Sequence, residues 1–191
     1  MNVTIEKEVP NGIPKHAKLV FKGILFDTWH WEQELFDGSF TTFEAVVRKG
    51  SIQLFCMVED KILLYEEEQP LRGSFISLPG GQLDDSDETP ELGAKRELLE
   101  EMGMEGEFEF FMETSLGSNI IWPTYYYIVK HCSIVQEPER EAGEKINPLL
   151  LSFEDFISYT QREDFRNKGF QQYIKTLIDK NALEEFRNKL L

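Results

Sequence analysis

Three carboxylates gather near the end of one short stretch of the chain, Glu97, Glu100 and Glu101. Their spacing of i, i+3 and i+4 puts them on one side of a helix. Like charges so close repel each other, so the helix gains no stability from them unless a cation lies between them. Hard divalent cations such as Mg²⁺ or Mn²⁺ prefer oxygen ligands. The pattern therefore indicates either a metal site or an acidic face in contact with solvent.

The residues around the carboxylates predict the helix that must position them. Thr89 can cap its first turn, Pro90 suits the first helical position, and Gly103 stands where a left-handed stop is expected. The apolar residues fall within an arc of about 120° at the helical period, and we expect that arc to face a core. These are Leu92, Leu98, Leu99 and Met102.

The wider pattern resembles the Nudix box, G-x5-E-x7-R-E-U-x-E-E-x-G-U, in which U is a bulky aliphatic residue. The matching residues are Gly81, Glu88, Arg96, Glu97, Leu98, Glu100, Glu101, Gly103 and Met104. Six residues rather than five separate Gly81 from Glu88, so the additional residue lies in the loop before the helix. The chain is thus similar to a Nudix hydrolase, with the helical ligands in register.

This resemblance implies a set of metal ligands and a cofactor. In the family the box glutamates bind Mg²⁺ or Mn²⁺, and the corresponding residues here are Glu97, Glu100 and Glu101. Glu100 and Glu101 are also the expected catalytic residues of the box. The carbonyl at the position of Gly80 is a further ligand in the family, and glycine permits the backbone geometry that aims it. We expect Arg96 to hold the box carboxylates in place rather than to bind substrate.

Residues 31–44, W-x-x-E-L-F-D-G-S-x-x-x-F-E, resemble the N-terminal region of the ADP-ribose pyrophosphatase branch. In that branch the region forms a small sheet that helps to build a homodimer and contributes to the substrate pocket. Phe43 stands where the relatives stack an aromatic ring on adenine. Glu44 and Arg48 match positions that contact base and phosphates, and Arg72 lies within one residue of an arginine that binds the diphosphate. A guanidinium suits phosphate oxygens.

A charged, turn-rich segment at 135–145 predicts a mobile surface loop. The relatives carry a catalytic glutamate in this loop, shortly before a strand. Glu144 fits that position best and is the candidate general base, with Glu141 as the second candidate.

Composition limits the partners and the compartment. The net charge of −15 argues against nucleic acid and anionic membranes as partners. Cys56 and Cys132 lie far apart without a metal-binding spacing, and no stretch predicts a signal peptide or a membrane span. We expect a cytoplasmic protein with reduced thiols that binds a small molecule, a nucleoside diphosphate derivative.

The fold we expect is the α/β Nudix fold, a mixed sheet with helices packed on it. Residues 1–48 would form an N-terminal antiparallel β extension for dimerisation and substrate contacts, and residues 49–191 the hydrolase domain with C-terminal helices. The expected strands and helices are 18–47 as a small sheet, strands 51–58, 61–67, 108–113 and 125–131, and helices 152–162, 164–179 and 181–191.

The predicted reaction is metal-dependent cleavage of a diphosphate, most simply ADP-ribose to AMP and ribose 5-phosphate. Two alternatives stay open at this point. The substrate could be a nucleotide sugar or another dinucleotide, because pocket loops rather than the box select it. The domain could also be a non-catalytic Nudix-derived scaffold that binds a ligand.

Overall fold

The computed structural model describes residues 9–117, 119–140, 143 and 145–190. Contacts divide the chain into two compact units. The first comprises the described part of Met1–Ser51 together with Glu113–Thr124, and the second comprises Ile52–Met112 and Tyr125–Leu191. None of the described helices is long and apolar enough to cross a membrane.

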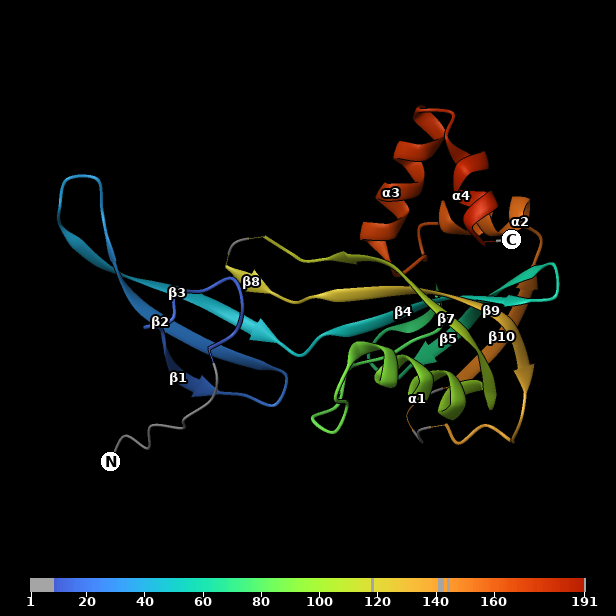
Figure 1. Ribbon diagram of the computed structural model, residues 1–191, viewed down its shortest axis with the longest axis horizontal. Helices are drawn as coiled ribbons and strands as arrows, with labels where there is room; N and C mark the ends of the chain where they lie inside the picture. Colours follow the sequence, from blue (N-terminus) through green and yellow to red (C-terminus); the bar gives the residue numbers. More distant parts are fainter. Residues whose placement is uncertain (1–8, 118, 141–142, 144, 191) are drawn as a thin grey trace. The chain divides into compact units, whose positions relative to one another are not determined.

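The first unit is built on a sheet with the strand order β1-β2-β3-β8 (Figure 1). Its strands are β1 (Lys18–Lys22), β2 (Phe26–Glu34), β3 (Phe40–Arg48) and β8 (Ile120–Ile121). Strands β1, β2 and β3 pair antiparallel, as the alternating sequence predicts, whereas β8 adds in parallel to β3. A small core around Trp29 and Ala45 supports this sheet, and these two residues lie opposite each other in the β2–β3 register.

The second unit contains a mixed sheet in the order β10-β5-β4-β9-β7, with β6 paired to β5. Its strands are β4 (Ser51–Val58), β5 (Lys61–Gln69), β6 (Gly73–Ser77), β7 (Met104–Thr114), β9 (Thr124–Ile134) and β10 (Lys145–Leu151). The strands at 51–58 and 61–67 are thus confirmed. Those expected at 108–113 and 125–131 are longer than predicted.

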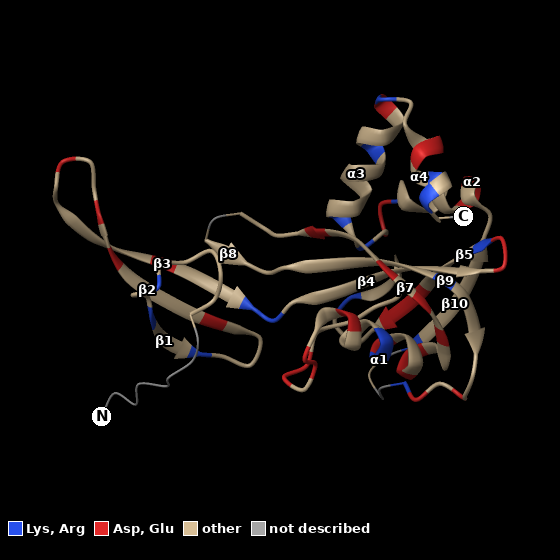
Figure 2. Cartoon of the chain, viewed as in Figure 1, with Lys and Arg blue, Asp and Glu red and all other residues tan. Residues whose placement is uncertain are grey.

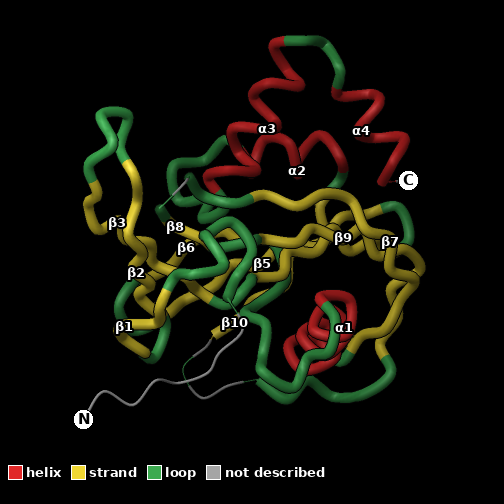
Figure 3. The backbone as a smooth tube through the Cα atoms, turned by 60° about the vertical axis from the view of Figure 1, so that its left-hand side comes forward, coloured by secondary structure: helices red, strands yellow, loops and turns green. Residues whose placement is uncertain are grey.

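Helices cover both faces of this second sheet, because its strands are apolar on both sides. On β4, Phe55 and Met57 pack against α2 (Phe153–Thr160), α3 (Lys168–Asp179) and α4 (Leu183–Leu190). The alternate residues Leu54 and Cys56 pack on the opposite face, under α1 (Pro90–Met102). Figure 3 shows α1 on one side of the sheet and the other three helices on the other side.

The ends of α1 are formed as the sequence predicts. The Thr89 hydroxyl accepts a hydrogen bond from the Leu92 amide at 3.2 Å. Gly103 has φ 63° and donates its amide to the carbonyls of Leu98 and Leu99. The expected apolar arc is only partly right, because Leu92 is exposed and the buried face of α1 runs through Ala94, Leu98 and Glu101.

The C-terminal helices are shorter than expected. α3 begins at Lys168 rather than at 164 because the preceding residues pair with β6. The Ile76 amide donates to the Asp164 carbonyl at 3.0 Å, and the Arg166 amide donates to the Ile76 carbonyl at 2.8 Å. The Asp164 carbonyl and the Arg166 amide are therefore bonded to β6 and cannot take part in the hydrogen bonds of a longer helix.

Candidate active site

The Gly80–Gly81 turn lies directly against two of the box carboxylates. The Gly80 amide donates to Oε2 of Glu101 at 3.3 Å, and Glu101 is only 8% exposed. A Cβ at Gly81 would stand 2.3 Å from Oε2 of Glu97. The turn is anchored on β4, where the Ile52 amide donates to the Gly81 carbonyl at 2.8 Å. The i, i+4 pair Glu97 and Glu101 therefore reaches the same turn.

Arg96 donates hydrogen bonds to three carboxylates, as expected for a residue that holds the box carboxylates in place. Its Nη1 donates to Glu97 at 3.0 Å and to Glu100 at 2.9 Å. Its Nε and Nη2 donate to the two oxygens of Asp87 at 3.1 and 2.8 Å. The hydrogen bonds that Arg96 donates to Asp87 above all, then the charge of Glu97 and the hydrogen bonds to Glu100 and Glu97, raise the pKa of the Arg96 guanidinium above its usual value. Arg96 thus stays charged and fixes the spacing of three acidic groups.

The lengthened loop before α1 closes on itself. The Asp87 amide donates to the Asp84 carbonyl at 3.2 Å, and the Asp84 amide donates to Oδ2 of Asp87 at 2.7 Å. The additional residue is absorbed in this turn, and the side chain of Asp87 is presented to Arg96. The register of Glu97, Glu100 and Glu101 on the helix is therefore unaffected.

Tyr65 on β5 is a neighbour of Glu101 and belongs to the core cluster that packs against α1. Burial, and then the negative charge of Glu101, raise the pKa of the Tyr65 hydroxyl well above its usual value, while the positive charge of Arg140 opposes the shift. Tyr65 is therefore neutral beside a buried carboxylate.

The chemistry of the donors fits a hard divalent cation. Carboxylate oxygens of Glu97 and Glu101 reach the Gly80–Gly81 turn, where the missing Cβ of Gly81 leaves room for Glu97 and the Gly80 amide donates to Glu101. Acidic residues lie along α1 and in the loop before it (Figure 2). Within the described ranges, no group of three or more His, Cys, Asp or Glu side chains already converges as a metal site. Arg96 engages Glu97 and Glu100 in this structure.

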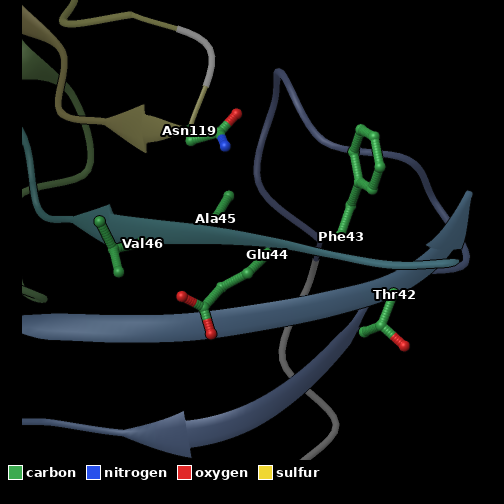
Figure 4. Close-up of a pocket in the computed structure, with 6 residues that line it drawn as sticks. All are labelled: Thr42, Phe43, Glu44, Ala45, Val46 and Asn119. Carbon is green, nitrogen blue, oxygen red and sulfur yellow. The ribbon is translucent and has the colours of Figure 1, made fainter.

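The first unit contains a pocket of about 360 Å³ around β3. Its lining residues are Thr42, Phe43, Glu44, Ala45, Val46 and Asn119. In Figure 4 the ring of Phe43 and the amide of Asn119 lie on one side of β3, and the Glu44 carboxylate points to the other. Glu44 lies 2.8 Å from Nε2 of His30, and the Phe43 ring is 5.9 Å from that of Trp31. Phe43 and Glu44 both line the pocket, although their side chains leave β3 on opposite sides.

Arg48 lies at the end of the same strand, and its guanidinium contacts two aromatic rings. Its Cζ atom is 4.2 Å from the Trp122 ring centroid and 5.7 Å from that of Phe26. The Trp122 indole donates to the Ser51 hydroxyl at 2.8 Å, which fixes the ring. The contact with the fixed Trp122 ring restrains the position of the Arg48 guanidinium.

Arg72 stands apart from these residues in the chain, in the turn between β5 and β6 of the second unit. It is exposed, and its amide donates to the Gln69 carbonyl at 3.1 Å. The two candidates for the general base, Glu144 and Glu141, lie outside the described residues.

Several residues at these sites gave no signal in the sequence. Asn119 and Trp122 come from a segment without periodicity or motif, and His30 was one of three scattered histidines. Only the fold brings Asn119 to Phe43 and Trp122 to Arg48. Arg140 sits in the loop expected to be mobile, yet its side chain is hydrogen-bonded to α1.

Comparison with known proteins gives two matches of different kinds. A family model described as NUDIX domain matches residues 48–173 of the 191. A comparison with curated proteins gives no match. Among solved structures, the crystal structure of an ADP compounds hydrolase is similar with a TM-score of 0.64 and 18% sequence identity, over 90% of this chain and 94% of that one. This likeness confirms the expected α/β fold.

Proposed function

Because the chain belongs to the NUDIX family of hydrolases, we propose that it cleaves the diphosphate of a nucleoside diphosphate derivative in a metal-dependent reaction. The observation that carries this proposal is the meeting of Glu97 and Glu101 at the Gly80–Gly81 turn. ADP-ribose is the proposed substrate, giving AMP and ribose 5-phosphate. The adenine nucleotide is proposed from the resemblance of residues 31–44 to the ADP-ribose pyrophosphatase branch, and the ADP compounds hydrolase, at 18% identity, supports the fold.

Mg²⁺ or Mn²⁺ is the proposed cofactor, held by Glu97, Glu100, Glu101 and the Gly80 carbonyl. When bound, such an ion neutralises the diphosphate and lowers the pKa of a coordinated water. The chain's part is to hold four oxygens in place. Burial of Glu101 and the contact of Glu97 with Gly81 restrict two of them before any ion arrives.

Glu144 is the proposed general base, with Glu141 in reserve. In the reaction one water oxygen forms a bond to phosphorus and the bridging P–O bond breaks. One proton of the water goes to the base and then to solvent, and the departing phosphate leaves with the bridging oxygen. A loop glutamate suits this role if it comes within hydrogen-bond reach of the water once substrate is bound.

Phe43, Glu44, Arg48 and Arg72 are the proposed substrate contacts. Phe43 is 40% exposed in its pocket, so its ring is accessible for stacking on a base. The Glu44 carboxylate can accept a hydrogen bond from an exocyclic amine. Arg48 and Arg72 would stabilise charge on the phosphates as the bond breaks.

The experiment is product analysis after incubation of the purified protein with Mg²⁺ and a panel of diphosphates. The panel contains ADP-ribose, a nucleotide sugar and a dinucleotide, and the Glu100→Gln/Glu101→Gln variant is the control. We expect AMP and ribose 5-phosphate from ADP-ribose with the wild-type protein alone. Faster cleavage of another panel member would change the substrate. No cleavage of any member, with ligand binding retained, would favour the non-catalytic scaffold.

We also propose that residues 1–48 support a homodimer of a cytoplasmic protein. The first unit exposes many large apolar side chains, as surfaces that bind another protein often do. They are Val20, Phe21, Ile24, Leu25, Phe26, Leu35, Phe36, Phe40 and Ile120. A second copy of the chain would bury them through a symmetric contact.

Sedimentation equilibrium tests the dimer with two variants. We expect wild type to sediment as a dimer and Phe40→Asp, at a side chain 64% exposed, to sediment as a monomer. Ile178→Asp on α3 is the matched control, since this residue is also exposed but lies in the second unit. A monomeric wild type at micromolar concentration would refute the proposal.

A further inference from the structure

The carboxyl end of α1 concentrates negative charge. Glu100 and Glu101 stand in its last turn, and no basic residue occurs in that turn of the fully described helix. The helix dipole adds a partial negative charge at the same end. A cation supplied by another segment would therefore stabilise this end of the helix.

Arg140 is the cation that reaches this end. Its Nε donates to the Glu101 carbonyl at 2.9 Å, and its Nη1 donates to the Ile146 carbonyl at 3.0 Å. Its Nη2 lies 3.9 Å from the Met102 sulfur. One planar guanidinium thus connects the last turn of α1 to the first residues of β10.

Neighbouring backbone groups reinforce this connection. The Glu139 amide donates to the Glu100 carbonyl at 2.7 Å. The amides of Val135 and Gln136 donate to the Gly103 carbonyl at 2.8 and 3.2 Å. A Cβ at Gly103 would stand 2.0 Å from the Gln136 carbonyl oxygen, so glycine is required for this close approach. Residues 135–140 therefore cap the carbonyl groups of the box helix.

We propose that Arg140 is a positioning residue for the metal-binding carboxylates. Its bond to the Glu101 carbonyl fixes the backbone of the last helical turn, and with it the direction in which the side chains of Glu100 and Glu101 leave the helix. Its charge offsets the repulsion between those carboxylates before a cation binds. This inference rests on the proposed function, and neither the box motif nor the resemblance assigns a role to Arg140.

Three variants separate charge from geometry. Arg140→Ala removes both, Arg140→Lys keeps the charge but cannot bridge two carbonyls with a planar fork, and Arg187→Ala is the matched control. Arg187 forms an exposed ion pair with Glu154 at 3.0 Å on α4, outside the site. Mn²⁺ binding to the substrate-free protein is measured by calorimetry, and kcat and KM are measured over a Mg²⁺ titration.

We expect Arg140→Ala to weaken Mn²⁺ binding about tenfold, as loss of an outer partner of metal ligands does. The Mg²⁺ concentration for half-maximal kcat should rise by about the same factor. KM for the diphosphate at saturating Mg²⁺ should stay near the wild-type value. Arg140→Lys should fall between Arg140→Ala and wild type, and Arg187→Ala should match wild type in Mn²⁺ binding and kcat.

The outcomes against the inference are distinct from those against the function. Unchanged Mn²⁺ binding and Mg²⁺ dependence in a folded Arg140→Ala variant, with only a lower melting temperature, would reduce Arg140 to a structural residue. If Arg140→Ala does not fold, wild-type Mn²⁺ binding in Arg140→Lys would overturn the geometric role. If the wild-type protein itself binds no Mn²⁺, the proposed function fails first and the inference with it.

Discussion

Gly81 lies so close to Glu97 that any β-carbon at position 81 would stand 2.3–2.6 Å from the atoms of the Glu97 carboxyl group. The glycine is therefore required by a side chain of the box helix rather than by its own turn. Gly80 differs, because the backbone itself requires glycine there. Its φ is 133°, and an added Cβ would stand 2.2 Å from the Ile52 carbonyl oxygen. The two adjacent glycines consequently give different predictions.

Gly81→Ala is expected to fold but to lose activity. The methyl group meets the carboxylate end of the Glu97 side chain, so Glu97 must turn away and give up its hydrogen bond with Arg96, while Arg96 keeps Asp87 and Glu100. We therefore expect a smaller loss of stability than from a clash with the backbone. That movement removes a proposed metal ligand, and we expect at least about a tenfold higher Mg²⁺ requirement. Thermal unfolding and a Mg²⁺ titration of kcat measure both properties.

Gly80→Ala is the matched comparison. We expect it to lower the free energy of unfolding by about 1–3 kcal/mol relative to wild type. Equal losses of stability in the two alanine variants would show that the contact between Gly81 and Glu97 is not the reason for the glycine.

Arg96→Ala should destabilise the protein in a way that a divalent cation partly reverses. Arg96 has hydrogen bonds with Asp87, Glu97 and Glu100, and the side chains of Asp87 and Glu97 are only 6% and 12% exposed. Removing one partner from a partly buried network leaves uncompensated charge, which costs about 3 kcal/mol.

The measurement is the melting temperature of Arg96→Ala and wild type, each with EDTA and with millimolar Mg²⁺. We expect Mg²⁺ to raise the melting temperature of the variant by more than that of wild type, because the ion takes over part of the lost positive charge. An identical Mg²⁺ effect on both proteins would argue that the ion does not bind at these carboxylates.

The parts of the fold that could be predicted are those governed by local rules. Thr89, Pro90 and Gly103 define α1 through capping and backbone conformation, and the structure confirms each of them. The exposure of Leu92 could not be foreseen, because helical periodicity gives an apolar arc but not its rotation against a particular sheet. The start of α3 was missed because a bridge to Ile76 outweighs local helical propensity.

The candidate site divides in the same manner. Box residues that share a helix, such as Glu97 and Glu101, are placed by their spacing alone. Asn119 and Trp122 lie more than seventy residues from their partners Phe43 and Arg48, and nothing local marks them. Arg140 was hidden in a polar loop whose composition predicts mobility, although its hydrogen bonds to α1 hold it.

Trp122→Leu should weaken substrate binding more than turnover. The Trp122 ring restrains the Arg48 guanidinium at 4.2 Å, a contact of about 0.5–2 kcal/mol. If Arg48 contacts the phosphates, its loss of order should raise KM by about three- to tenfold with a smaller effect on kcat.

Trp122→Phe keeps a ring over Arg48 and loses the hydrogen bond to Ser51, so it separates stacking from that bond. Steady-state kinetics of both variants with the best substrate of the panel provide the values. An unchanged KM in both would remove Arg48 from substrate binding.

The central claim is that the box carboxylates at the Gly80–Gly81 turn drive a metal-dependent hydrolysis. The most direct test measures AMP formation from ADP-ribose during a Mg²⁺ titration, with wild type and Glu101→Gln compared at equal folded concentration. Glu101 is buried, and glutamine preserves its volume while removing the charge. We predict AMP formation by wild type that depends on Mg²⁺, with kcat lower by orders of magnitude in Glu101→Gln. A normal kcat in that variant, or cleavage by wild type that EDTA does not abolish, would contradict the claim.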